Sequence, residues 1–355
     1  MAGLDVPQLK PDEIRRILIR ATNWIGDAVM TLPALEAVGE TFPLSAITVL
    51  TKPWVAPIYE SHPAVRSVMI FDKSGGSLNA VGSIIKASGR VRRGQFDLAI
   101  LFQNAFEAAL IAFLGGIRRR AGYTTDARGL LLTHGISPHT AQKNQHQVEY
   151  YLDLMRGLGW KERTRDPYIY VPESWRFEVS GLMASSGIED DRFLLGLAPG
   201  AAFGKAKRWP AKRFAEIGDR AAEEWDARVL IFGSEGEQHI CHEVMDDMTH
   251  RPFNLCGRTS LSQAIAWIDR CKFFLSNDSG LMHVASALNV PTVAVFGSTD
   301  PVATGPRGAK TAIVRHPVSC APCLKPQCDR DYRCLYGVTV ERVWEEMKRL
   351  WRTSR

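Results

Sequence analysis

Several features are missing from this sequence of 355 residues, and each absence excludes a class of protein. No stretch of about eighteen consecutive apolar residues is present, so the sequence predicts no membrane-spanning helix. Residues 1–13 are polar and include acidic side chains, which argues against a secretory signal. The seven cysteines are an odd number without a small-domain disulfide framework, which favours a reducing compartment. We therefore expect a cytoplasmic protein.

The chain also has little excess charge, with a formal net charge of +6 at pH 7. The basic residues are nevertheless clustered. Residues 86–93 contain four lysines or arginines and no acid, and Arg118, Arg119 and Arg120 are consecutive. Such clusters suit an anionic partner, although a solvated face is the alternative explanation. No aromatic interleaving or nucleic-acid motif accompanies them, so we expect no nucleic-acid partner.

Strand-like and helix-like segments alternate along both halves of the chain, which indicates an α/β fold with two parallel sheets. The predicted strands are residues 14–21, 46–50, 65–71, 97–102, 193–198, 228–232, 253–255, 273–276 and 292–296. The predicted helices are residues 28–39, 77–92, 104–114, 146–158, 210–225, 237–248, 260–268, 279–289 and 340–351. We expect an N-terminal domain at 1–175, a linker at 171–190 and a C-terminal domain at 190–335. A final helix at 338–355 would cap the second domain or cross back onto the first.

Two short polar turns follow predicted strands and precede predicted helices. Residues 21–27 contain Gly26 and Asp27, and residues 276–280 contain Asp278. The carboxyl ends of parallel strands are where open α/β sheets hold ligands, and a helix start offers free backbone N–H groups to an anion. The two turns therefore predict two facing domains with one ligand cleft between them.

Asp27 is a candidate general base, because removing a proton from an alcohol needs a carboxylate or imidazole within hydrogen-bond reach. A helix N-cap is the alternative role for this residue. Residues 198–210 combine glycines with Lys205, Lys207 and Arg208, a composition that suits phosphate binding. The loop lacks the Gly-Lys-Ser/Thr ending of a Walker motif, and a merely solvated basic loop is the alternative.

Three residues in the second half have both a functional and a structural explanation. Glu235 follows a strand end, where it could accept from ribose hydroxyls or simply favour a helix start. Asp278 can cap the helix that begins at residue 279. His283 on that helix could contact a phosphate or sugar, or could be structural.

Four cysteines, Cys320, Cys323, Cys328 and Cys334, have the spacing C-x2-C-x4-C-x5-C. Four thiols within fifteen residues could hold a structural zinc ion. The second pair does not have C-x2-C spacing and no histidine lies within the cluster, so a metal-free role is the alternative.

In combination these motifs resemble the ADP-heptose:lipopolysaccharide heptosyltransferases, glycosyltransferase family 9, from residue 17 to about residue 335. The motifs that carry the resemblance are Asn23-Trp24-Ile25-Gly26-Asp27, Thr31-Leu32-Pro33-Ala34-Leu35, Lys207-Arg208-Trp209-Pro210, and Ser276-Asn277-Asp278-Ser279-Gly280 with His283. The sequence of residues 203–210 and the cysteine cluster most resemble those of the members that add the second inner-core heptose to the first.

The resemblance implies a GT-B fold, with two Rossmann-like domains facing across a cleft. It also implies an inverting transfer of L-glycero-D-manno-heptose from ADP-L-glycero-β-D-manno-heptose to the first heptose of the lipopolysaccharide inner core on Kdo–lipid A. No cofactor is implied, the transfer is expected to need no metal, and the enzyme would associate peripherally with the cytoplasmic face of the inner membrane. A family member with another acceptor (heptosyltransferase I or III), a UDP-sugar 2-epimerase and a non-catalytic binding module remain alternatives.

The resemblance also assigns roles by position. Asp27 matches the proposed catalytic base, Lys207 the lysine that holds the donor diphosphate, and Glu235 the acid near the ribose. The other implied donor-site residues are Ala202, Phe203, Asp278, Ser279, Gly280 and His283. By weaker analogy, Arg118, Arg119 and Arg120 would face the anionic acceptor.

Overall fold

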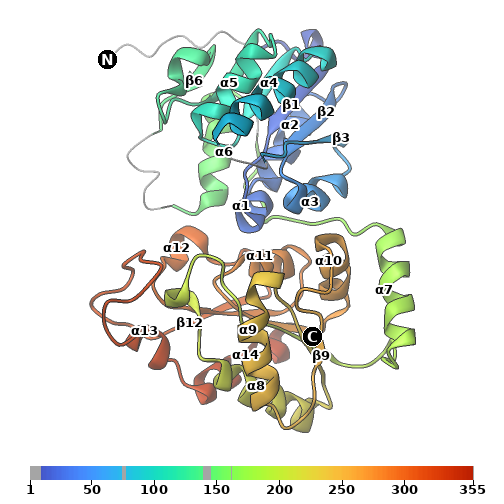
Figure 1. Ribbon diagram of the computed structural model, residues 1–355, viewed down its shortest axis with the longest axis vertical. Coiled ribbons are helices and arrows are strands. Elements are labelled where there is room, and N and C mark those ends of the chain that lie inside the picture. Colours follow the sequence, from blue (N-terminus) through green and yellow to red (C-terminus); the bar gives the residue numbers. More distant parts are fainter. Residues whose placement is uncertain (1–8, 74–76, 139–144, 161, 355) are drawn as a thin grey trace. The chain divides into compact units, whose positions relative to one another are not determined.

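The computed structural model describes residues 9–73, 77–138, 145–160 and 162–354 (Figure 1). The chain divides into two compact units, Met1–Asp166 and Pro167–Arg355, each built on one six-stranded parallel sheet. Residues 1–8, which belong to the stretch that argued against a signal sequence, lie outside the described residues. Within the described ranges, no helix is both long and apolar enough to cross a membrane.

The sheet of unit 1 has the strand order β3-β2-β1-β4-β5-β6, and helices cover both of its faces (Figure 1). Its strands are β1 (Arg16–Arg20), β2 (Ala46–Thr51), β3 (Val65–Ile70), β4 (Leu98–Leu101), β5 (Arg119–Tyr123) and β6 (His134–Ile136). Its helices are α1 (Ile25–Met30), α2 (Leu32–Thr41), α3 (Ala56–Glu60), α4 (Ser77–Gly94), α5 (Phe106–Leu114) and α6 (Gln147–Gly157). The central strands β1 and β4 are almost wholly buried, as expected for a parallel sheet covered on both faces.

The sheet of unit 2 has the order β12-β11-β10-β7-β8-β9, which is the same topology read from the other edge. Its strands are β7 (Leu194–Ala198), β8 (Arg228–Ile231), β9 (Phe253–Asn254), β10 (Phe273–Asn277), β11 (Thr292–Phe296) and β12 (Thr311–Arg315). Its helices are α7 (Glu173–Ser185), α8 (Ala211–Trp225), α9 (Gln238–Asp247), α10 (Leu261–Arg270), α11 (Gly280–Ala287), α12 (Pro301–Thr304), α13 (Arg333–Tyr336) and α14 (Val340–Ser354). Both units therefore have the doubly wound order in which the chain reverses direction between two central strands.

The predicted α/β class is confirmed, but several elements differ from the sequence prediction. Strands β5, β6 and β12 were not predicted. Strand β5 begins with two arginines, β6 has three residues, and β12 is a partly exposed edge strand. The residues expected to be a linker, 171–190, contain helix α7, which packs on α10 and is tied to it by an Arg176–Asp269 ion pair at 2.8 Å. Pro172 misled the prediction, because it is the residue at which this helix begins rather than a break.

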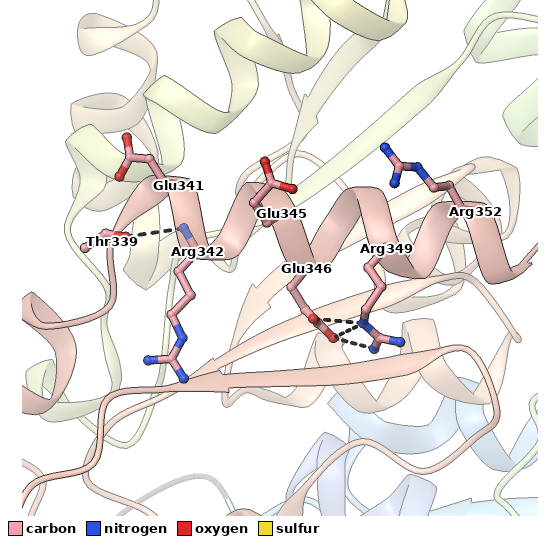
Figure 2. A pocket seen from close by; sticks show the side chains of 7 residues that line it. All are labelled: Thr339, Glu341, Arg342, Glu345, Glu346, Arg349 and Arg352. Atoms are coloured by element: carbon pink, nitrogen blue, oxygen red, sulfur yellow. Dashed lines mark hydrogen bonds and ion pairs between the residues drawn. The ribbon is translucent and has the colours of Figure 1, made fainter.

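Helix α14 packs on unit 2, against α8, β11 and β12. Trp344 is buried and stacks on Trp225 with 4.5 Å between ring centroids. The outer face of α14 borders a shallow groove lined by both acids and arginines, among them the Glu346–Arg349 pair (Figure 2). Mixed charge of this kind is typical of a solvated helix face, and a buried Trp344 is not available to a membrane.

Candidate functional site

The strand order of unit 2 reverses between β7 and β10, which lie side by side with Ala198 opposite Ser276. From β7 the chain runs to β8 on one side, and from β10 it runs to β11 on the other. The loops that leave these two strands therefore flank a crevice at the carboxyl edge, where doubly wound sheets bind ligands. These are the two loops of the second half that the sequence singled out.

Asn277 clamps the two loops together. Its amide Nδ2 donates to the carbonyl of Pro199 at 2.7 Å, and its Oδ1 accepts from the backbone N–H of Trp209 at 3.0 Å. The side chain is fully buried, so these bonds form without competition from water. The sequence identified Asn277 only as part of a motif. Its positioning role could not be predicted, because both partners are backbone groups far away in the sequence.

The buried carboxylate of Asp278 bonds to side chains from two other loops at the carboxyl edge of the sheet. Asp278 Oδ2 lies 2.6 Å from Lys207 Nζ and accepts from Thr299 Oγ1 at 2.6 Å. The side chain of Asp278 is 4% exposed and that of Lys207 is 14% exposed. The loops after β7, β10 and β11 thus meet at one charge pair, with Lys207 at the boundary between protein and solvent.

The N-terminus of α11 lies directly beside this pair. Ser279 occupies the N-cap position, but its side chain makes no capping bond; its hydroxyl lies 3.0 Å from that of Ser276. The first-turn N–H groups, beginning at Gly280, therefore have no side-chain cap. His283 is buried one turn further along the helix.

The three cations of the basic loop after β7, Lys205, Lys207 and Arg208, differ in exposure and in the groups they contact. Arg208 donates to the carbonyl of Ala201 and lies 2.9 Å from His239, so it holds the loop in shape. Lys205 is exposed, whereas Lys207 points to Asp278 and lies 5.0 Å from the ring of Phe203. Ala202 and Phe203 are exposed on the same loop. Only Lys207 among the three combines partial burial with a place in the crevice.

Glu235 and Glu237 lie on the 3-10 turn that follows β8. Glu237 forms a capping box with Ser234 and packs so closely on Gly200 that a Cβ at that position would lie 2.2 Å from its carboxylate. Glu235 is exposed. The structural role therefore belongs to Glu237, which leaves the Glu235 carboxylate available to a ligand.

In unit 1 the corresponding reversal lies between β1 and β4, and Asp27 follows β1 in the first turn of α1. The turn between β1 and α1 is anchored by Arg20, which is 1% exposed. Its guanidinium donates to the carbonyls of Ala21 and Leu50 and to Asn23 Oδ1. Burial lowers the pKa of Arg20 to about 10, so it stays protonated at neutral pH. The turn that carries Asp27 is therefore held rigidly by these hydrogen bonds.

Asp27 is partly buried near two buried phenols. Burial raises the pKa of Tyr59 to about 12, and the Asp27 carboxylate contributes to the shift. Burial also raises the pKa of Tyr151, again with a contribution from Asp27. Both phenols remain neutral. Trp24 is the N-cap residue of α1, whereas Asp27 lies in the first turn of that helix. The predicted alternative, a simple N-cap, is therefore wrong.

Lys52 lies at the carboxyl end of β2, on the same edge as Asp27, and is 9% exposed. Its Nζ is 4.6 Å from the ring centroid of Phe71 and 5.6 Å from that of Trp54. Burial, followed by the charge of Arg20, lowers the pKa of Lys52. Within the part of the chain that the structure describes, this ammonium group forms no direct ion pair, but the charges of Glu107 and Asp72 act in the opposite direction and raise its pKa.

Arg118, Arg119 and Arg120 lie at the amino end of β5, whereas Asp27 follows the carboxyl end of β1 in the same parallel sheet. Arg119 pairs with Glu13 at 2.8 Å, and Arg120 donates to the carbonyls of Ile117 and Leu131. The expected acceptor role of this cluster does not fit this placement, because opposite ends of parallel strands lie at opposite edges. The sequence could not reveal this, since β5 itself was not predicted.

Comparison with known proteins connects this architecture to characterised enzymes. Residues 84–332 match the family model for glycosyltransferase family 9 (heptosyltransferase). Lipopolysaccharide heptosyltransferase 2 of Escherichia coli K12 is 30% identical over 94% of this chain and 98% of its own length. The structure of E. coli ADP-heptose lipopolysaccharide heptosyltransferase II has a TM-score of 0.82 at 27% identity, covering 95% of this chain and 99% of that one. A family 9 glycosyltransferase from Veillonella parvula has a TM-score of 0.87 at 23% identity, covering 98% and 100%, which shows a shared fold.

Proposed function

Because the chain belongs to glycosyltransferase family 9, the heptosyltransferases, we propose that it transfers L-glycero-D-manno-heptose from ADP-heptose to the first heptose of the lipopolysaccharide inner core. The relatives named heptosyltransferase 2 support this choice of acceptor. The observation that carries the proposal is the Lys207–Asp278 pair beside the uncapped start of α11. An ammonium group and free backbone N–H groups at one point form a site for a diphosphate.

Donor binding follows from the chemistry of this site. An ammonium group has three N–H donors, and Lys207 directs one at Asp278, which leaves two for phosphate oxygens. Negative charge that develops on the leaving ADP would be met by Lys207 and by the N–H groups of Ser279 and Gly280. Ala202 and Phe203 border the same crevice, and Glu235 is exposed for the ribose hydroxyls. These groups stabilise a leaving diphosphate without a divalent metal, so we propose metal-independent transfer.

Asp27 is proposed as the catalytic base. The acceptor hydroxyl oxygen attacks the anomeric carbon, the bond from that carbon to the ADP oxygen breaks, and configuration inverts. An ordinary carboxylate is too weak a base to ionise an alcohol in advance, so Asp27 takes the proton as the new bond forms. The neutral phenols of Tyr59 and Tyr151 behind it cannot compete for this role, because their pKa values are raised.

Lys52 replaces the arginines at 118–120 as the proposed acceptor contact. It is a largely desolvated cation at the Asp27 edge, faced by aromatic rings instead of a carboxylate. An anionic acceptor such as a Kdo-bearing oligosaccharide would form the direct ion pair that this ammonium group lacks within the described residues.

Helix α4 supports a peripheral contact with the cytoplasmic face of the inner membrane. Val81 and Ile85 are exposed apolar side chains, and Lys86, Arg92 and Arg93 are exposed cations on the same helix. This combination binds anionic lipid surfaces without spanning them.

We expect product from ADP-heptose and a lipid A–Kdo acceptor that bears one heptose, and none from the same acceptor without heptose. The assay is run without added divalent metal and resolved by mass spectrometry. Product from the bare Kdo acceptor would instead indicate a heptosyltransferase I activity. Free sugar released from donor alone would indicate an epimerase. Binding of ADP without any product would revive a non-catalytic module.

Asp27→Asn should lower kcat by about 10²- to 10⁴-fold while ADP binding is retained, because the amide cannot accept the proton. The matched control is Asp97→Asn at the opposite edge of the same sheet, where the carboxylate accepts from the backbone N–H groups of Arg15 and Arg16 at 2.8 and 2.9 Å. The control should lose stability but not kcat per folded molecule. A kcat for Asp27→Asn near that of the wild type would refute the assignment.

Lys207→Ala and Lys52→Ala should separate donor binding from acceptor binding. Loss of a charged hydrogen bond is worth about 1.5–3 kcal/mol, so Lys207→Ala should weaken ADP binding by about 10- to 100-fold in calorimetry. Lys52→Ala should raise the acceptor KM and leave ADP affinity unchanged. Lys205→Ala, an exposed lysine of the same loop, is the control and should bind ADP like the wild type. Equal effects of Lys205→Ala and Lys207→Ala would reject the specific role of Lys207.

Binding to anionic phospholipid vesicles should be measurable at low salt and should weaken as salt is added, because exposed cations on α4 provide the attraction. Substitution of Lys86 and Arg93 by Ser should weaken sedimentation with these vesicles. Vesicle binding that is insensitive to both salt and this substitution would contradict the proposed contact.

A further inference from the structure

Two of the nine tryptophans in this chain are exposed, and both lie at the carboxyl edge of the unit 1 sheet. Trp24 follows β1 and is 64% exposed, and Trp54 follows the neighbouring strand β2 and is 53% exposed. Tryptophan is mostly buried in folded proteins, and large apolar side chains that are exposed together mark a binding surface. We call these two side chains the tryptophan pair.

The tryptophan pair is joined through the turn after β1. The indole Nε1 of Trp54 donates to the carbonyl of Asn23 at 2.8 Å, and Asn23 is the residue before Trp24. The Asn23 side chain in turn accepts from the buried guanidinium of Arg20 at 3.3 Å. The one polar group of the Trp54 ring is thus satisfied by the protein, so the rest of the exposed ring is apolar. A ring held in this way loses little further freedom when it binds a ligand.

Trp24 lies beside the proposed catalytic base. It is the N-cap residue of α1, and Asp27 is the third residue of that helix. The N-cap and third positions of a helix are close in space, which is why side chains at these positions can form a capping box. An acceptor hydroxyl that gives its proton to Asp27 therefore brings its own sugar ring close to Trp24.

The charges at this edge indicate what kind of ligand the rings bind. Lys52 Nζ lies 5.6 Å from the Trp54 ring centroid and forms no direct ion pair within the described residues. Glu107 acts on Lys52 at longer range, but it is itself paired with Lys73 at 2.5 Å. The edge thus combines apolar ring faces with a cation that can take a direct anionic partner. A sugar acid linked to a neutral sugar has both features, because a sugar ring presents C–H groups on its faces and hydroxyl groups at its rim.

A lipid bilayer is the other kind of surface to which exposed tryptophans bind. Anionic bilayers attract such sites through exposed cations, whereas Lys52 is 9% exposed and lies against the rings of Phe71 and Trp54. The hydrogen bond of Trp54 also occupies the indole N–H that would otherwise lie among lipid headgroups. These observations favour a sugar over a bilayer.

We propose that Trp24 and Trp54 stack on sugar rings of the anionic acceptor and thereby select an acceptor that already carries a heptose. The identity of the acceptor rests on the proposed function. The heptose nearest Asp27 packs on Trp24, while Trp54 and Lys52 hold the adjoining acidic sugar by its ring face and its carboxylate. No bond is made or broken at either ring, so the tryptophan pair contributes to acceptor binding and not to donor binding.

The first test measures binding of a deacylated Kdo oligosaccharide that bears one heptose, by calorimetry on the full-length chain. Trp24→Ala and Trp54→Ala should each weaken this binding by about 10- to 30-fold, as for tryptophans that anchor an interface, and leave ADP affinity unchanged. Trp24→Phe should restore most of the affinity, because the phenyl ring keeps a face for stacking. Phe177→Ala, which removes an 83% exposed ring on α7, is the matched control and should bind like the wild type.

The same oligosaccharide without its heptose separates the roles of the two rings. Trp24→Ala should weaken binding of the heptose-bearing form and leave that of the bare Kdo form nearly unchanged, so the preference between them should fall. Trp54→Ala should weaken binding of both forms. Thermal unfolding at the wild-type temperature checks that each variant is folded.

Unchanged oligosaccharide affinity in both alanine variants, or a wild-type chain that binds no oligosaccharide, would overturn the proposal. Weaker sedimentation of the variants with anionic vesicles, at unchanged oligosaccharide affinity, would assign the rings to a bilayer instead. A wild-type chain that binds the oligosaccharide through the tryptophan pair but forms no product from ADP-heptose would contradict the proposed function alone.

Discussion

The buried carboxylate of Asp278 is the constraint on which the proposed donor site depends. A carboxylate that is almost entirely removed from water must be paired, and here it is paired twice, by the ammonium of Lys207 and the hydroxyl of Thr299. The two partners come from loops after β7 and β11, so satisfying one charge fixes the relative positions of three chain segments. Removing either Asp278 or Lys207 would leave the other charge uncompensated, which typically costs about 3–5 kcal/mol at buried sites.

The pairing also explains why Lys207 is prepared for an anionic ligand. A free lysine side chain loses rotamer freedom when it binds, whereas Lys207 is already held by Asp278 and by contact with the Phe203 ring. Asn277 prepares the backbone in the same sense, because its two buried hydrogen bonds join the loop ends at Pro199 and Trp209. Pre-organised donors strengthen binding to charge that develops in a transition state, since no reorganisation is required at the moment of reaction.

The sequence predicted the α/β class and the central strands well, because strands covered on both faces require continuous apolar runs, which β1, β7 and β10 have. The same patterns located Asp27, Lys207 and Asp278. Asp278 directly follows such a strand, and Asp27 and Lys207 lie a few residues beyond one, in or just after the loop that leaves it. Strand β5 was missed because its sequence begins with two arginines, so the sequence alone could not place Arg118–Arg120, whose acceptor role came from the family resemblance. The roles of Asn277 and Lys52 could not be predicted, because their partners are backbone groups and aromatic rings that only the fold brings near.

The two units treat their buried cations differently, and the difference has a chemical reason. In unit 2 Lys207 has a protein carboxylate as its partner, so the crevice is close to neutral before a ligand binds. In unit 1 Arg20 bonds to carbonyl groups and Lys52 faces aromatic rings, and the carboxylate of Glu107 acts on both cations without a direct ion pair. A diphosphate leaving group must be released after each turnover, and a compensated lysine limits how tightly the product is held. A negatively charged acceptor would pair directly with the Lys52 ammonium group, which is the acceptor contact that we propose.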